Sequence, residues 1–241
     1  MCYVLCVVCY VKFMAKNKLK RFADLKTFSN VLEPEEARLG FETQFNWQKV
    51  FGNDNPITLE LACGKGDYTL ALAKLFPKRN FIGIDIKGAR LWKGAKNALS
   101  EKLPNVAFLR IQIENLEKYF IPLPLFERHA ERRCRITEIW LTFPDPFPRK
   151  KQIKKRLTSP RFLAMYKKIL QPGSMLHLKT DDLNLLNYSV ETALAEGWKI
   201  KEVINNIYAL PKPGSLLAIK TFYERQHLNA GKQIHYLKIT L

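Results

Sequence analysis

The segment TFPDPFPRKK at 142–151 places a single carboxylate, Asp145, between closely spaced prolines and directly before a run of cations. Prolines fix the backbone angle φ and donate no backbone hydrogen bond, so this loop is expected to be stiff. A carboxylate held in this way loses little conformational entropy when it engages a ligand, which suits the orientation of a reactant. The alternative is a plain rigid turn, because proline and aspartate are common in turns.

The cations after this loop form the run RKKQIKKR at 149–156, which begins four residues after Asp145. Such a run is usually a solvated surface, but here it adjoins a candidate site. The chain carries 40 lysines and arginines against 22 acidic residues, and its net charge of +18 exceeds what solubility requires. We therefore expect a polyanionic partner, nucleic acid rather than membrane, with its phosphates bound by Lys150, Lys151, Lys154, Lys155 and Arg156.

A second segment with the residue types of a ligand site is ELACGKGDY at 60–68. Gly64 and Gly66 let the backbone turn tightly and approach a ligand, and a helix that begins near Asp67 would present free amide groups. Tight connections without a ligand use the same pattern, so the loop alone does not decide between the two. Asp85 adds to the case, because an acid at the end of the next strand can accept both hydroxyls of a ribose.

Glu60 bears on which nucleotide-like ligand this loop would bind. A dinucleotide site uses G-x-G-x-x-G to seat a pyrophosphate, whereas this chain has A-x-G-x-G preceded by an acid that would repel phosphates. The carboxylate of Glu60 suits the cationic end of S-adenosylmethionine, directly or through a water, although capping or bracing of the loop is the alternative. Glu60, the two glycines and Asp85 together favour S-adenosylmethionine.

Short β-rich runs alternate with helical patterns along the chain, which is typical of a mostly parallel sheet with helices on both faces. Asp145 follows one of these runs, and the carboxyl ends of strands near a switch point border the ligand crevice. The final two strands are expected to form an antiparallel hairpin at one sheet edge, joined by a short connection. The predicted strands lie at 57–62, 80–85, 105–111, 136–142, 174–180, 198–208 and 232–241, and the predicted helices at 67–76, 87–102, 159–170 and 181–196.

The length of 241 residues suits a single α/β domain. We expect that translation begins at Met14, so that 1–13 is an over-extended start or a disordered tail, with a basic lead-in at 14–50 and the main domain at 51–241. The lead-in contains KNKLKR at 16–21. No metal is expected, because Cys6 and Cys9 lack the two further ligands of a zinc site. The remaining cysteines, Cys63 and Cys134, are isolated, which suits the cytoplasm.

Three motifs carry a resemblance to a known family: FPDPFPRKK, LKTDD at 178–182 and TFYE at 221–224, in this order. With them, residues 16–241 resemble the bacterial single-subunit tRNA (guanine-N7)-methyltransferases. The resemblance implies a Rossmann-like class I methyltransferase fold with a seven-stranded sheet. It also implies methyl transfer from S-adenosylmethionine to N7 of guanine 46 in the tRNA variable loop.

The resemblance also assigns roles to residues, and three positions depart from the family pattern. Ala62 replaces the first glycine of the loop, Gln112 stands where the family commonly has an acid, and Arg149 replaces a lysine. An amide can still pair with an adenine edge, and arginine keeps the charge but presents a planar fork. By the resemblance, Glu60, Gly64, Gly66, Asp85, Gln112 and Asp145 bind the cofactor, and Arg149, Asp181, Thr221, Phe222, Tyr223 and Glu224 bind the guanine.

Two other functions remain open at this point. The Asp145-Pro146-Phe147 segment is similar to the loops of amino-group methyltransferases that act on adenine or cytosine, although it lacks their second proline. A non-catalytic RNA-binding protein with a methyltransferase fold is the other alternative. The sequence leaves open whether the protein is a monomer or a homodimer.

Overall fold

The computed structural model describes residues 19–34, 46–121 and 135–241. The expected N-terminal extension at 1–13, most of the KNKLKR segment and Cys134 therefore lie outside the described residues. Residues 19–25 are helical and place Leu25 in the buried core, so this part of the basic lead-in packs against the main domain.

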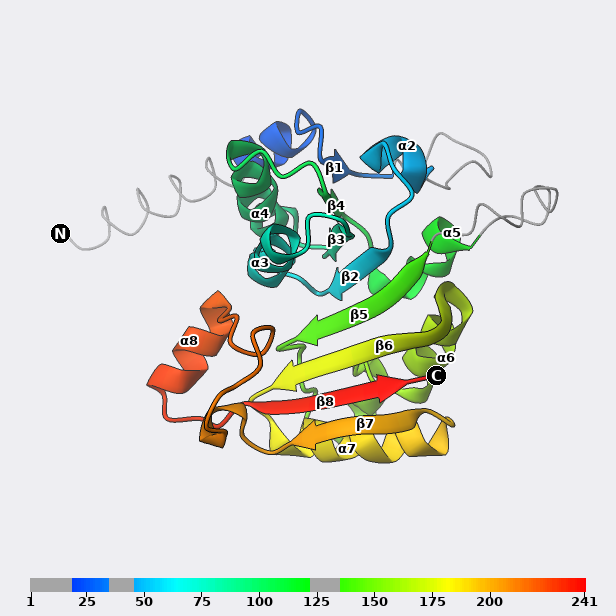
Figure 1. Ribbon diagram of the computed structural model, residues 1–241, viewed down its shortest axis with the longest axis vertical. Coiled ribbons are helices and arrows are strands. Elements are labelled where there is room, and N and C mark those ends of the chain that lie inside the picture. Colours follow the sequence, from blue (N-terminus) through cyan, green and yellow to red (C-terminus); the bar gives the residue numbers. More distant parts are fainter. Residues whose placement is uncertain (1–18, 35–45, 122–134) are drawn as a thin grey trace, which may run out of the picture.

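The described part of the chain forms one sheet of eight strands, in the order β1-β4-β3-β2-β5-β6-β8-β7 (Figure 1). All seven predicted strands are confirmed, and the additional strand is the two-residue β1 at one edge. Strand β8 runs antiparallel to β6 and β7, and the other pairs are parallel. The strands are β1 Val31–Leu32, β2 Ile57–Leu61, β3 Asn80–Ile84, β4 Val106–Leu109, β5 Ile136–Thr142, β6 Leu170–Thr180, β7 Lys199–Ile204 and β8 His235–Thr240.

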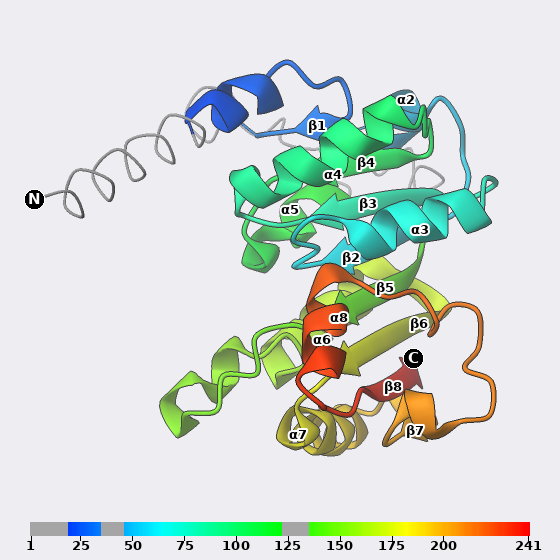
Figure 2. The ribbon, with the colours of Figure 1, turned by 90° about the vertical axis from the view of Figure 1, so that its left-hand side faces the viewer.

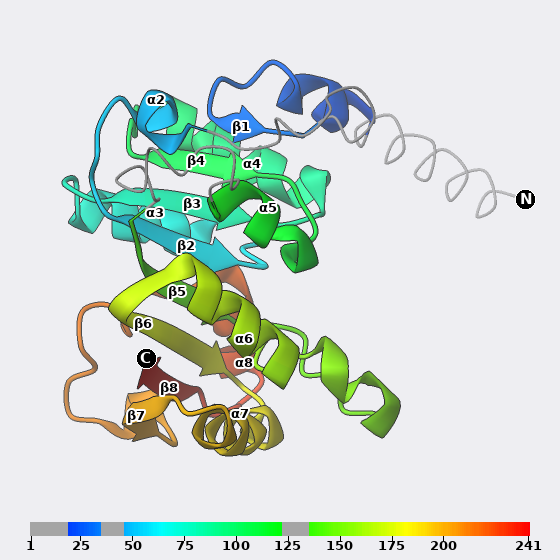
Figure 3. The same ribbon diagram turned by 90° about the vertical axis from the view of Figure 1, so that its right-hand side faces the viewer.

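Helices cover both faces of the sheet, as predicted. Figure 2 shows α3, α4 and α8 on one face, and Figure 3 shows α5, α6 and α7 on the other. Every residue of β2, β3 and β4 is buried, which explains why the sequences of these strands are almost entirely apolar. The helices are α2 Trp47–Phe51, α3 Asp67–Leu75, α4 Gly88–Ser100, α5 Glu117–Phe120, α6 Pro160–Ile169, α7 Leu183–Ala195 and α8 Phe222–Asn229, with 3-10 turns η1 Ile113–Asn115, η3 Lys150–Lys155 and η4 Ile207–Ala209.

The order of the strands places a switch point between β2 and β5. From β2 the chain builds outward through β3 and β4, and it then returns to place β5 on the other side of β2. In open α/β sheets, the crevice outside the carboxyl ends of the strands at such a point is where ligands bind. The loops that contain Gly64 and Asp145 both leave the sheet there.

The connection between the last two strands differs from the expected short link. The strands pair antiparallel at the edge as predicted, but β7 ends at Ile204 and β8 begins at His235, so the connection is long and contains η4 and α8. Because β7 is parallel to the central strands and β8 is antiparallel, this connection lies entirely at the carboxyl edge. It therefore brings α8 beside the candidate site.

Candidate active site at the carboxyl edge of the sheet

A cleft of about 830 Å³ opens at the carboxyl edge of the sheet. It is bordered by the segments that follow β2, β3, β4, β5 and β6 and by the first turn of α8. Segments far apart in the sequence thus converge on one cavity, which is typical of ligand sites in this class of sheet. Of the residues predicted to bind cofactor, guanine or RNA, the cleft is lined by Glu60, Asp85, Gln112, Asp145, Lys154, Lys155, Asp181, Thr221, Phe222 and Tyr223.

The loop after β2 turns through three residues with positive φ. Gly64 and Gly66 have φ of 58° and 69°, and Ala62 has φ of 55°. A Cβ on Gly66 would lie 2.6 Å from Cε1 of Phe108, whereas one on Gly64 would meet nothing closer than the Tyr223 ring at 3.8 Å. Gly66 is therefore required for the packing of the loop, and Gly64 faces the cleft wall. Ala62 has a strained backbone conformation that would not be strained in a glycine.

Asp85 follows β3 and holds the glycine loop from the neighbouring strand. One carboxylate oxygen accepts a hydrogen bond from the Gly64 amide at 2.9 Å, and the other accepts one from the Lys87 amide at 2.8 Å. The side chain is buried and lines the cleft. Each oxygen of an ionised carboxylate can accept more than one hydrogen bond, so both can also receive a ribose hydroxyl.

Glu60 is buried within β2 and already has partners in the protein. Its Oε2 accepts hydrogen bonds from the amide and hydroxyl of Thr69 in α3, and its Oε1 accepts one from the Thr142 hydroxyl at the end of β5, at 2.7 Å. Burial raises the pKa of the Glu60 carboxyl to about 7, against the opposing effect of these hydrogen bonds. The geometry favours the bracing role that the sequence left open beside cofactor binding.

Gln112 and Asp145 present polar groups to the cleft without a partner among the described residues. Gln112 follows β4, is exposed and makes no side-chain hydrogen bond at the start of η1. Asp145 is also exposed, and no hydrogen bond or ion pair to another described residue engages its carboxylate. Both side chains are therefore free to receive a ligand.

The Asp145 loop is strained on both sides of the carboxylate. Phe143 and Phe147 have φ of 53° and 42°, a conformation that bulky side chains rarely adopt. Arg156 holds the loop in place, because its guanidinium donates to the carbonyl oxygens of Pro146 and Phe147 at 2.8 and 3.3 Å. Such strain persists only where surrounding contacts over-determine the backbone.

The geometry of Arg156 does not support the prediction that it binds RNA phosphates. Its side chain is buried, it packs over the Tyr188 ring at 4.5 Å, and its guanidinium is directed at the loop carbonyls. A sequence run of cations does not reveal which member turns inward. The 3-10 turn η3 and the residue after it place Arg156 on the inner side, while Lys154 and Lys155 stay exposed.

Asp181 lies at the end of β6 and is separate from the cap of the following helix. Asp182, not Asp181, caps α7, since its side chain accepts a hydrogen bond from the Leu185 amide at 2.7 Å. One oxygen of Asp181 accepts from Lys232 at 2.5 Å and lies 3.2 Å from Nδ1 of His227. These two partners, which sequence reasoning missed, orient the carboxylate in the cleft.

The first turn of α8 forms one wall of the cleft. Thr221 caps the helix, Phe222 is exposed beneath the Lys65 ammonium at 3.5 Å, and Tyr223 lies beside the glycine loop. Glu224 does not line the cleft: it is fully buried and forms an ion pair with Lys179 at 2.8 Å. The expectation that Glu224 contacts guanine is therefore not supported, because its carboxylate is directed into the protein.

The predicted cations divide into two groups. Lys154 and Lys155 line the cleft, whereas Arg149, Lys150 and Lys151 are exposed but do not. Figure 2 shows the yellow-green segment that contains η3 projecting away from the body of the molecule. Cations that the sequence did not single out also border the cavity: Lys65, Lys87, Arg90, Arg161 and Lys232.

Among the described residues, no cluster of three or more His, Cys, Asp or Glu side chains has a geometry that could hold a metal ion. Within the same part of the chain, no helix has the length and apolar character needed to cross a membrane.

Comparison with known proteins identifies the family. The model of a family described as putative methyltransferase matches residues 54–237. A tRNA (guanine-N(7)-)-methyltransferase from Christiangramia forsetii is 44% identical over 232 residues, which cover 94% of this chain and 99% of the relative. The chain belongs to the tRNA (guanine-N7)-methyltransferase family. An enzyme of the same name from Bacteroides thetaiotaomicron is 40% identical, over 95% of this chain and 87% of its own length.

Solved structures support the fold of this family member. The crystal structure of the 16S rRNA methyltransferase KamB matches with a TM-score of 0.58 at 16% identity, over 81% of this chain and 92% of that chain. A structure of an antibiotic-related methyltransferase matches with a TM-score of 0.57, also at 16% identity, over 86% of this chain and 96% of that one. At such low identity the likeness establishes the Rossmann-like methyltransferase fold alone.

The glycine loop yields a paired prediction on stability. Ala62→Gly should raise the free energy of unfolding by about 0.5 to 1 kcal/mol, because relief of the left-handed strain exceeds the added freedom of the unfolded chain. Gly66→Ala should lower it by about 2 kcal/mol, because a methyl group must displace the Phe108 ring. Urea unfolding measures both, and a destabilised Ala62→Gly variant would contradict the assigned strain.

Proposed function

We propose that this protein transfers a methyl group from S-adenosylmethionine to N7 of guanine 46 in the variable loop of tRNA, in the cytoplasm. The observation that carries the proposal is the Asp145 carboxylate, which lies in the cleft on a strained and braced loop without a partner among the described residues. Membership of the family supports the same reaction. The basic segments that border the cleft suit a tRNA substrate.

The residues that line the cleft fit S-adenosylmethionine. Asp85 retains acceptor capacity for ribose hydroxyls, and Gln112 offers both a donor and an acceptor to an adenine edge. The glycine loop can approach the ligand closely, since space remains beside Gly64. Glu60 can act on a cationic ligand through its charge, and its Oε1, which accepts one hydrogen bond from Thr142, can accept another from an ammonium group or a water.

The chemistry requires positioning rather than a general base. S-adenosylmethionine, when bound, supplies a methyl group on a positively charged sulfur. Guanine N7 carries a lone pair and no proton, so the new N–C bond forms as the C–S bond breaks, and the electron pair of that bond remains on sulfur. Holding the reactants in line can lower the activation barrier by several kcal/mol, on the order of the effect found for well-oriented intramolecular reactions.

Carboxylates in the cleft suit the charge that develops on the purine. As methyl transfer proceeds, positive charge moves from sulfur to guanine, and Asp145 and Asp181 can stabilise it there. The same oxygens can accept hydrogen bonds from the N1 and N2 groups of guanine, a pairing that adenine does not offer. Asp181 keeps one oxygen for this role, since Lys232 and His227 both engage the other.

Nucleoside analysis tests the proposed function directly. Unmodified tRNA incubated with the protein and labelled S-adenosylmethionine should yield 7-methylguanosine, and a transcript with adenine at position 46 should yield none. Adenosine or cytidine methylated on its exocyclic amino group would instead identify an amino-group methyltransferase. The absence of any transfer, with tRNA binding retained, would identify an RNA-binding protein.

Asp145→Asn should lower kcat for tRNA methylation by at least about 10²-fold, in the range found when one preorganised electrostatic partner is removed. Asparagine keeps the shape of the side chain but loses the charge that the developing purine cation requires. Asp54→Asn is the matched control, because Asp54 is an exposed acid that precedes β2 at the opposite edge of the sheet. Turnover of the Asp145 variant close to that of the control would show that this carboxylate is dispensable.

The two lysines of η3 that line the cleft should bind tRNA phosphates. In Lys154→Ala/Lys155→Ala, each lost contact should reduce the slope of log affinity against log salt by about 0.7 to 0.9. Lys199→Ala/Lys201→Ala removes the same charge from exposed positions on the edge strand β7 and should leave the slope unchanged. Equal slopes for the two variants would place the RNA elsewhere, and Lys150→Ala/Lys151→Ala then tests the outer part of η3.

A further inference from the structure

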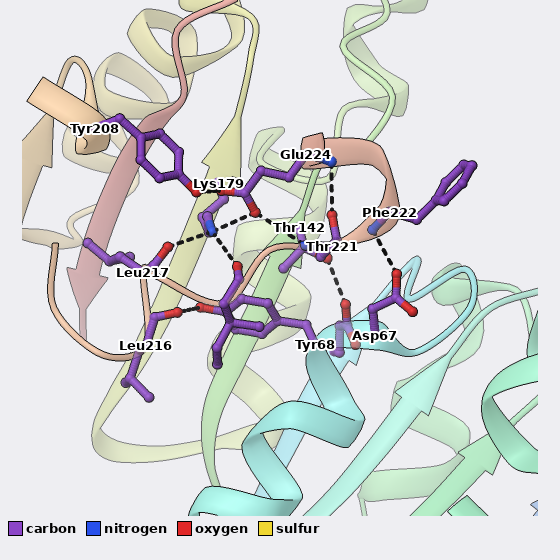
Figure 4. Close-up of polar contacts among 12 residues, drawn as sticks. Asp67, Tyr68, Thr142, Lys179, Tyr208, Leu216, Leu217, Thr221, Phe222 and Glu224 are labelled. Carbon is purple, nitrogen blue, oxygen red and sulfur yellow. Dashed lines mark hydrogen bonds and ion pairs between the residues drawn. The ribbon is translucent and has the colours of Figure 1, made fainter. Parts of the chain in front are cut away.

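A fully buried lysine lies beneath the cleft wall formed by α8. The Lys179 ammonium, near the end of β6, donates to the carbonyl oxygens of Leu217 and Ile219 at 3.0 Å each and to Oε2 of Glu224 at 2.8 Å (Figure 4). All three of its donors thus have partners. These partners belong to the connection between β7 and β8, so one side chain of the sheet holds this connection at three points.

Glu224 completes the same network from the helix side. Its Oε1 accepts a hydrogen bond from the Tyr208 hydroxyl at 2.7 Å, and its Oε2 accepts from the backbone amide of Thr221 at 3.4 Å as part of a capping box. The Thr221 hydroxyl in turn accepts from the Glu224 amide at 3.1 Å. The buried pair is therefore connected to the capping box in the first turn of α8.

That first turn is also tied to the opposite side of the cleft. The Phe222 amide donates to Asp67 at the start of α3 at 2.7 Å, and the Tyr223 ring lies next to Gly64. Tyr68 in α3 donates its hydroxyl to the carbonyl of Leu216 at 2.6 Å. The wall at 221–223 thus contacts both the Lys179 network and the glycine loop. Figure 4 shows Thr221 and Phe222 between Glu224 and Asp67.

We propose that Lys179 and Glu224 are positioning residues, whose buried ion pair sets the wall at 221–223 against the glycine loop and so governs the binding of both S-adenosylmethionine and guanine without touching either. The inference rests on the proposed function and assigns Glu224 a role different from guanine contact. A buried ion pair is weak support for stability, since apolar pairs of similar volume often replace it without loss. The effect of the ion pair on the position of the wall at 221–223 is therefore the property to measure.

The test uses Glu224→Gln, Lys179→Met and the double variant Lys179→Met/Glu224→Gln, which removes both charges at similar volume. Calorimetry measures S-adenosylmethionine affinity, hydrogen exchange measures protection of the Phe222 amide, and tRNA kinetics measure kcat and KM. All three variants should lose about tenfold or more in S-adenosylmethionine affinity and should lose protection at Phe222, with the double variant no worse than the single ones. Lys168→Met is the control, because it breaks a surface ion pair with Glu117 far from this network.

Two outcomes would overturn the proposal. If Glu224→Gln keeps S-adenosylmethionine affinity and Phe222 protection but loses turnover of tRNA, Glu224 contacts guanine directly. If the folded double variant keeps affinity, protection and kcat/KM while its Tm falls, the pair serves stability only. If a single variant does not fold, the double variant decides between these outcomes. Hydrogen exchange does not depend on the reaction, so a wild-type protein inactive on tRNA would refute the proposed function and leave this test standing.

Discussion

One buried carboxylate spans the switch point of the sheet. Glu60 lies in β2, and its hydrogen bonds reach Thr69 in α3 and Thr142 at the end of β5. The first contact fixes the helix that follows the glycine loop, and the second fixes the strand that leads into the Asp145 loop. Backbone pairing of β2 with β5 and the contact between the Tyr68 and Trp140 rings join the same elements, and Glu60 adds a polar link at the edge that borders the cleft. Hydrogen bonding by the ionised form is opposed by burial, and the pKa near 7 expresses this balance.

The cleft is preorganised by buried charged groups that do not face it. Arg156 holds the strained Asp145 loop from behind, and Lys179 with Glu224 holds the first turn of α8. Burial lowers the pKa of the Lys179 ammonium, while Glu224 opposes this shift. In both cases an ionic side chain with several directed donors fixes backbone carbonyls, which an apolar residue cannot do. Side chains that face the cleft can then keep their polar groups for ligands.

Much of the fold followed from the sequence, because apolar runs of strand length and their alternation with helical patterns are local signals. The glycine loop, Asp85 and Asp145 were likewise placed at the right strand ends, since parallel strands bring their carboxyl ends together. Contacts between distant residues could not be predicted. Lys179 and Glu224 are 45 residues apart, and nothing in the charge pattern pairs them. The connection that contains α8 was misjudged because its helix has little apolar periodicity, with only Glu224 fully buried.

Acids and cations both line the cleft, and the two act over different distances. Lys154 and Lys155 are exposed, so they attract phosphates across roughly a Debye length of 8 to 10 Å at moderate salt. Asp85, Asp145 and Asp181 act at hydrogen-bonding distance. Under the proposed function, the exposed lysines attract the RNA backbone, and the acids accept hydrogen bonds from an uncharged base that offers N–H donors. On this proposal, the lysines bind the phosphate, which anchors the nucleotide, and the carboxylates bind the base, which reacts.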